Sequence, residues 1–249
     1  SDASETDEPI RAPLADVGNI ESLVRALAAN RNDLVVTLAG SGDAALHPQL
    51  ADVIRRVRAA GASAVHVRTD LVEESPDVDA IALADVISIN LVADKKETYE
   101  ALTGADALER VFKNMERLTE KRRHSEGEWL GAPWCVARMT RCDAVYDDVE
   151  SFYNRWLLWL GGAVLDPMPG SAQGERIARL PLPRLAAERF ARDRMLVLTD
   201  GRVVADERDV SGETSVGNAF SENPLDVWRR LVDARRAAGD KARDWTMYA

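Results

Sequence analysis

The turn from Gly40 to Asp43 carries the clearest chemical pattern in the chain. It follows an apolar, β-branched run at residues 35–39, and a helix is predicted to start near Pro48. A strand, a glycine turn and a helix in this order open a βαβ unit. The glycines let a ligand approach backbone N–H groups, and the Asp43 carboxylate can bind an amine. The alternative is an ordinary strand–helix turn, in which the glycines are needed only for the backbone conformation. Short glycine motifs often occur by chance, so this motif alone does not identify a ligand site.

Polar residues also end the next predicted strands. Active sites of parallel α/β barrels form at the carboxyl ends of their strands, so these residues are candidates for binding and chemistry. Asp166 ends a later strand and joins them as a candidate for chemistry without a radical. The ligand-binding residues that we predict are Gly40, Ser41, Gly42, Asp43, Thr69, Ser88 and Asn90.

The chain has two cysteines and three histidines. Cys135 lies in a predicted strand and Cys142 just beyond its end, so a metal pair with His47 or His66 is conceivable. We favour a buried free thiol and a loop thiol, with His66 as a satisfied core or rim histidine. No metal ligand is therefore assigned, and no serine stands in the context of a nucleophile elbow.

The elements that must position these residues alternate between strand and helix. Asn19 is predicted to cap a first helix, and Gly61 ends the helix that starts near Pro48. Such alternation indicates an α/β fold with a parallel sheet and right-handed crossovers, either open or barrel-like. The further predicted elements are strands at 64–70, 85–90, 134–139 and 163–166 and helices at 78–83, 95–102, 108–122 and 147–160.

The pattern changes after Pro183, where short strands and turns replace the alternation. Residues 195–204 are predicted to form a β-hairpin with the Asp-Gly pair at 200–201 as its turn. We place a domain boundary near residue 183. The other elements predicted here are turns at 211–213 and 217–218 and a terminal helix at 224–237.

Composition and charge narrow the class of protein. The 249 residues are 46% hydrophobic and 30% charged, which is typical of a soluble globular protein. The net charge of −10 argues against non-specific binding to nucleic acid or anionic membranes. No run reaches the roughly 20 apolar residues that a membrane span needs, and no secretory leader opens the sequence. Two cysteines suit a reducing compartment, so a cytoplasmic protein is expected.

The turn at Gly40 to Asp43, followed by residues 46–48 (Leu-His-Pro), resembles a segment of the radical S-adenosylmethionine (SAM) superfamily. In that family the segment ends the second barrel strand and contacts the amino group of the methionine moiety. Asp43 matches the acidic position of the family segment, whereas Ala44 replaces its usual proline. The resemblance implies that SAM is a possible ligand of this turn.

Later segments extend the resemblance in the family's order. Residues 88–90 with 93–104 are similar to the fourth-strand segment, and residues 152–156 and 164–167 resemble the barrel units that follow. Segments between residues 195 and 228 resemble the SPASM-type C-terminal extension. The resemblance implies a partial (β/α) TIM-type barrel with a small α+β extension. It divides the chain into a disordered or poorly structured N-terminus at 1–18, a partial barrel at 19–183 and a SPASM-like region at 184–249.

The cysteines that radical SAM chemistry requires are missing from these 249 residues. The family holds its [4Fe–4S] cluster with three thiolates of a C-x3-C-x2-C loop, and residues 9–18, where that loop is expected, contain no cysteine. The family's paired SPASM cysteines fall on Asp206 and Glu207, and its closing motif survives only in part, at 239–245. Carboxylates do not replace thiolates in such a cluster, so we expect no [4Fe–4S] cluster.

Three functions remain open at this point. The first is a catalytically inactive radical-SAM/SPASM-like pseudoenzyme that acts as a partner or substrate-presenting subunit for an active homologue, or that self-associates. The second is a cluster-free enzyme that binds SAM or a small metabolite at the barrel mouth, and the third is a structural subunit. A lost first strand leaves a sheet edge to cover, and the tryptophans of 129–159 with the proline-rich crossover at 167–183 are the predicted partner surface.

Overall fold

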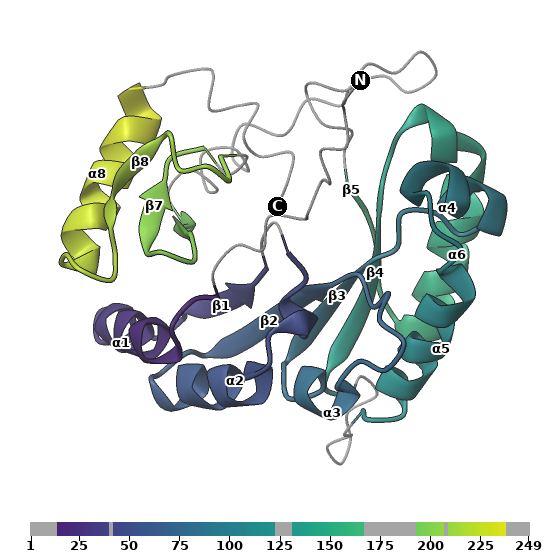
Figure 1. The fold of residues 1–249 in the computed structure, drawn as a ribbon, viewed down its shortest axis with the longest axis horizontal. Helices are drawn as coiled ribbons and strands as arrows, with labels where there is room; N and C mark the ends of the chain where they lie inside the picture. Colours follow the sequence, from purple (N-terminus) through teal and green to yellow (C-terminus); the bar gives the residue numbers. More distant parts are fainter. Residues whose placement is uncertain (1–13, 40–41, 123–130, 167–192, 207–208, 238–249) are drawn as a thin grey trace, which may run out of the picture.

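A five-stranded parallel sheet, whose strands pair in chain order, dominates the computed structural model (Figure 1). This sheet confirms the α/β class. Its outer strands, β1 and β5, do not pair with each other, so the described residues form no closed barrel. The strands are β1 (Val35–Leu38), β2 (Ala64–Thr69), β3 (Val86–Asn90), β4 (Trp134–Thr140) and β5 (Ala163–Asp166). The structure describes residues 14–39, 42–122, 131–166, 193–206 and 209–237.

Helices α1, α2, α3, α5 and α6 lie on one side of this sheet (Figure 1). Each strand pairs with its predecessor, and right-handed crossovers between such neighbours carry their helices to the same face. Among the described residues, no helix combines the length and apolar character needed to cross a membrane. The helices are α1 (Val17–Ala28), α2 (Leu50–Ala59), α3 (Val78–Ile81), α4 (Lys96–Thr103), α5 (Leu108–Thr119) and α6 (Val149–Leu160), with short 3₁₀ turns η1 (Ala44–Leu46) and η2 (Asp143–Asp148).

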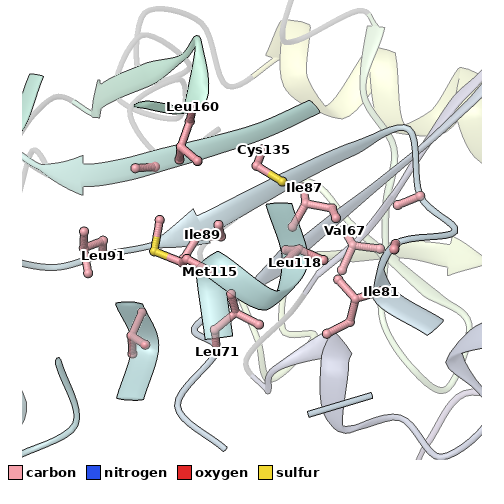
Figure 2. Close-up of a cluster of buried hydrophobic side chains, with 14 of the residues drawn as sticks. Val67, Leu71, Ile81, Ile87, Ile89, Leu91, Met115, Leu118, Cys135 and Leu160 are labelled. Atoms are coloured by element: carbon pink, nitrogen blue, oxygen red, sulfur yellow. The ribbon is translucent and has the colours of Figure 1, made fainter. Parts of the chain in front are cut away.

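The main core lies between these helices and the sheet face that they cover (Figure 2). Ile87 and Ile89 of β3 and Met115 and Leu118 of α5 are fully buried within it. Apolar residues three and four apart place one face of α5 against the sheet, while alternation in β3 turns every second side chain toward the helices. The two periodicities together therefore assemble the core from the sequence pattern.

The other strand residues point to the opposite side of the sheet, which we call the inner face. In β2, Val65 and Val67 are fully buried against the helices, whereas His66 and Arg68 are half-buried and point the other way. Parallel strands covered on both faces are usually apolar throughout, so a polar second face suggests binding rather than packing. The polar strand residues of the inner face are Thr37, His66, Arg68, Ser88, Asn90, Arg138, Thr140 and Asp166.

A smaller antiparallel sheet and one helix form a C-terminal lobe (Figure 1). The predicted hairpin is confirmed, and Gly201 in its turn has the positive φ of 88° that favours glycine. The turn predicted at Gly217 and Asn218 is wrong, because both residues pair with β7 in a strand. An added Cβ at Gly217 would lie 2.5 Å from the Arg230 guanidinium, the end of a flexible side chain. The lobe comprises β6 (Leu196–Val197), β7 (Arg202–Val204), β8 (Ser215–Asn218) and α8 (Pro224–Ala237).

Helix α1 belongs to both parts of the molecule. Val17 and Val24 contribute to the main core, whereas Leu23 packs with Val203 and Leu231 in the core of the C-terminal lobe. The predicted boundary near residue 183 and the crossover at 167–183 lie outside the described residues. The described lobe therefore contacts the sheet domain through α1 and does not stand apart from it.

The start of α1 corrects the prediction for the N-terminal segment. The helix begins at Val17, inside the segment 1–18 that was expected to be poorly structured. Its N-cap is Asp16, whose carboxylate accepts a hydrogen bond from the Asn19 backbone N–H at 2.9 Å. Asn19 was predicted as the cap, but the carboxylate three residues earlier satisfies the free amide of the first turn. Residues 1–13 lie outside the described part of the chain.

The core predicts a strong contrast between two leucines. Replacing the fully buried Leu118 with alanine should lower the free energy of unfolding by roughly 2–5 kcal/mol, because it leaves a cavity in the main core. Leu158, which is 87% exposed on α6, provides the matched control, and its alanine variant should differ little from wild type. Urea denaturation measures both, and equal losses in the two variants would contradict the described core.

Candidate functional site

Asp43 joins the loop after β1 to the end of β2. One of its carboxylate oxygens accepts a hydrogen bond from the Ala45 backbone N–H at 2.8 Å and caps η1. The other accepts bonds from the Thr69 hydroxyl at 2.8 Å and from the Asp70 backbone N–H at 2.9 Å. The carboxylate predicted to bind a ligand amine thus already holds three donors of its own chain.

The link continues to the end of β3. The Asn90 side-chain amide donates a hydrogen bond to the Asp70 carboxylate at 2.8 Å. The Thr69 hydroxyl also accepts a bond from the Leu71 backbone N–H at 3.1 Å, where Leu71 adopts a positive φ of 52°. Polar side chains therefore connect the carboxyl ends of three neighbouring strands into one edge.

The predicted ligand residues form two groups rather than one pocket. Ser88 and Asn90 point to the inner face, whereas Thr69 is buried on the helix side of its strand. Gly42 has an ordinary φ and open space around its Cα, so neither backbone strain nor close packing requires glycine there. Gly40 and Ser41 lie outside the described residues.

His66 lies at the centre of a polar row on the inner face. Its Nε2 is 2.8 Å from the Ser88 hydroxyl, and its Nδ1 is 3.3 Å from the Thr37 hydroxyl. Both ring nitrogens thus have partners, which confirms the expectation of a satisfied histidine. The sequence did not predict that His66 would contact a ligand candidate, because the contact depends on the pairing of β2 with β3.

Burial, and to a smaller extent the positive charges of Arg138, Arg68 and Arg194, together lower the pKa of His66 from 6.5 to about 4. The imidazole is therefore neutral near pH 7, when one nitrogen donates a hydrogen bond and the other accepts one. A neutral imidazole can orient Ser88 or take part in recognition of a ligand.

Arg138 and Asp166 form an ion pair across β4 and β5. The Arg138 guanidinium donates two hydrogen bonds to the two carboxylate oxygens, at 3.0 Å and 2.6 Å. Only 10% of the Arg138 side chain and 17% of the Asp166 side chain are exposed. Asp166, which was expected as a candidate for chemistry, is therefore engaged by an arginine. Arg138 was not selected from the sequence, although a charged residue within an otherwise apolar strand could have indicated it.

Cys135 and His66 occupy opposite faces of the sheet. Cys135 points into the main core beside Ile87 (Figure 2), and burial raises the pKa of its thiol. Cys142 follows β4 and is partly buried. Cys135 therefore cannot share a metal with His66, and the described residues hold no cluster of three potential metal ligands.

The predicted partner surface divides within α6. Trp156 is buried, lies 5.3 Å from the Phe112 ring and donates its indole N–H to the Asp94 carboxylate at 3.0 Å. Burial raises the pKa of Asp94, while Arg155 opposes that shift. The prediction that Trp156 belongs to a partner surface is therefore wrong, whereas Trp159 is 41% exposed. Trp129 lies outside the described residues.

Comparison with known proteins gives one distant relative to report. An uncharacterized protein of Treponema pallidum (strain Nichols) is 26% identical over 227 residues, which cover 85% of this chain. The match spans 62% of the length of that relative. No protein-family model matches the chain.

Asp43 is expected to contribute to stability. Asp43→Asn replaces one carboxylate oxygen with an NH2 group, which donates hydrogen bonds and does not accept them. This change can remove the acceptor of the Thr69 hydroxyl and of the Asp70 backbone N–H. The free energy of unfolding should fall by about 1–3 kcal/mol, because the hydroxyl of the buried Thr69 and the Asp70 backbone N–H lose their acceptor. Asp52→Asn, at an exposed ion pair on α2, is the matched control and should change little. Denaturation by urea checks both, and an Asp43 variant as stable as the control would contradict this role.

The lowered pKa of His66 predicts a pH dependence. Its pKa is 6.5 when unperturbed and about 4 in the folded protein, so between these values the unfolded chain binds more protons. The contribution of His66 to the free energy of unfolding is therefore complete above pH 6.5 and is lost as the pH falls toward 4. The difference in unfolding free energy between wild type and His66→Gln should therefore shrink across this window. Parallel curves from denaturation at several pH values would contradict the shift.

Proposed function

We propose that this chain is a radical-SAM-like protein without a cluster of its own, and that it acts as a partner or substrate-presenting subunit for a cluster-bearing homologue. The ordered series of sequence segments from Gly40 to residue 228 supports the relationship. A parallel sheet paired in chain order, with its helices on one face, is compatible with a partial (β/α) barrel. The partial barrel and the SPASM-like extension remain part of this proposal.

The small number of cysteine ligands in the chain supports the proposal of an inactive member of the radical SAM superfamily. The sequence supplies two cysteines, fewer thiolates than an Fe–S cluster needs. Cys135 is buried in the main core with its pKa raised, which disfavours the thiolate that binds iron. We therefore assign no residue of this chain as a cluster ligand. If the partner is not a cluster-bearing homologue, the alternative is a second copy of this chain.

The observation that carries the partner role is an exposed apolar surface on α6. Leu158 is 87% exposed, and Tyr153, Leu157 and Trp159 are each 40–41% exposed on the same helix. Tyr153 and Leu157 are four residues apart and so lie on one side of the helix. Large apolar side chains grouped in this way are typical of protein interfaces.

A second candidate function is binding of SAM or a small metabolite without a cluster. Its support is the inner face, where Ser88 and Asn90 lie beside the polar row of His66. Asp43 fits SAM only in part, because its oxygens already accept three hydrogen bonds from the chain. Calorimetric titration of the isolated chain with SAM distinguishes this candidate, since binding would favour it over a purely partner-based role.

The partner role predicts that α6 surface variants abolish capture. The tagged chain should capture a radical SAM homologue from the native host, identified by mass spectrometry and by its iron content. The double variant Leu157→Glu with Leu158→Glu should reduce that capture strongly, because it places charge in an apolar interface. Val210→Glu is the control, since Val210 is 66% exposed on the C-terminal lobe.

Two results would contradict this proposal. One is a monodisperse monomer near 27.4 kDa in light scattering that captures no such homologue. The other is capture that the α6 variant and the Val210 variant weaken equally, because charge alone would then explain the loss.

A further inference from the structure

Strand β1 forms an open edge of the parallel sheet. Among the described residues it pairs with β2 alone, in continuous register from Val35 to Leu38. A strand that is paired on one side leaves a row of backbone N–H and C=O groups, which can pair with another strand. Val35 is 56% exposed at this edge. The backbone of β1 can therefore accept a further strand.

This strand lacks the features by which proteins usually protect such edges. Its four residues, Val-Val-Thr-Leu, include neither a charge nor a proline, and no bulge interrupts its pairing with β2. The other described edge strands differ, because β5 ends in the charged Asp166, β6 has two residues, and β8 pairs with β7 across a register shift. Charges, short strands and bulges all oppose pairing between chains. Pairing is therefore least opposed at β1.

The side chains of β1 are complementary to those of a second β1. Val35 and Thr37 point to the inner face. Leu34, Val36 and Leu38 pack on the helix side of the strand. In an antiparallel pair centred on Val36, Leu34 lies opposite Leu38 of the second copy, and Val35 lies opposite Thr37. Each pair joins residues of the same face, and apolar and β-branched pairs of this kind stabilise a sheet.

Charge allows two copies of this acidic chain to meet at β1. The net charge of −10 makes two copies repel each other in general. The charged residues that precede β1, Arg31 and Asp33, neutralise each other through two hydrogen bonds at 2.8 Å. In the register centred on Val36, Asp33 lies opposite the uncharged Ala39. Like charges, which would destabilise the pair, therefore do not face each other along this edge.

We propose that β1 pairs in antiparallel fashion with β1 of a second copy of this chain, so that the two parallel sheets become continuous. Such a contact uses the same residues on both sides and closes at a dimer. The second copy places its Val35 beside Thr37, whose hydroxyl lies 3.3 Å from His66 Nδ1, and so adds a residue to the inner face. The dimer goes beyond the proposed function, because α6 lies at the opposite end of the sheet (Figure 1).

Light scattering over a range of protein concentrations tests this pairing. The mass should rise from 27.4 kDa toward twice that value as the concentration increases. Val35→Lys should weaken the association roughly tenfold or more, because a charge on an edge strand opposes pairing. Val210→Lys makes the same change at a 66% exposed side chain of the C-terminal lobe and should leave the association unchanged.

A disulfide between the two copies reports the register and does not depend on the folding of Val35→Lys. Val36 lies opposite itself in the proposed pair, and directly opposed Cβ atoms of antiparallel strands are about 4.5–5.5 Å apart. Val36→Cys should therefore form a covalent dimer on mild oxidation. Val210→Cys should not form it, and oxidation of the wild type accounts for Cys135 and Cys142.

Three results would overturn the proposal. They are a mass that stays at 27.4 kDa at every concentration, equal weakening by Val35→Lys and Val210→Lys, and a dimer that Val36→Cys does not link. If the monomer protects its β1 amides from hydrogen exchange, a segment of the chain itself covers the edge.

The dimer and the proposed function can fail separately. The double variant Leu157→Glu with Leu158→Glu should retain the dimer while it loses capture of a homologue. Loss of capture in Val35→Lys, with no dimer of the isolated chain, would instead assign the β1 edge to the homologue and contradict pairing between two copies.

Discussion

The pairing of β1 to β5 in chain order is the constraint on which the rest of the structure depends. Because every crossover joins neighbouring strands, its right-handedness places the connecting helices on one face. The main core is therefore one-sided, and strand alternation sends every second residue to a face that those helices do not cover. The polar row at His66 and the ion pair between Arg138 and Asp166 both arise on that face. The same pairing thus builds the core on one face and places the candidate site on the other.

The carboxylates at the carboxyl edge of the sheet accept hydrogen bonds from neighbouring loops and side chains. Asp43 accepts hydrogen bonds from two backbone amides and the Thr69 hydroxyl, and Asp94 accepts from Trp156 and Arg155. Loops at this edge contain amides that no strand or helix satisfies, and carboxylates supply acceptors for them. The edge carboxylates therefore stabilise the loops of the fold.

The two parts of the molecule are connected by packing through α1. Leu23 of α1 enters the core of the C-terminal lobe, while its neighbour Val24 enters the main core. Within the lobe, Arg235 donates hydrogen bonds to the carbonyl oxygens of Arg194 and Ala205, which hold the segment before β6 against α8. A single helix therefore takes part in both cores and joins the lobe to the sheet domain.

The sequence by itself determined the α/β class, the positions of most strands and helices, and the hairpin at Gly201, because periodicity and turn chemistry are local properties. It also placed Asn90 at the end of a strand, whereas Ser88 lies in the middle of β3 and Asp43 in the loop after β1. Only the tertiary structure decided that Asp43 binds its own chain, that Thr69 faces the helices, and that Gly217 lies in a strand. It likewise joined Arg138 of β4 to Asp166 of β5 in an ion pair. These features depend on strand register and loop packing, which bring together residues on different strands and loops, such as Asp43 and Thr69, 26 positions apart.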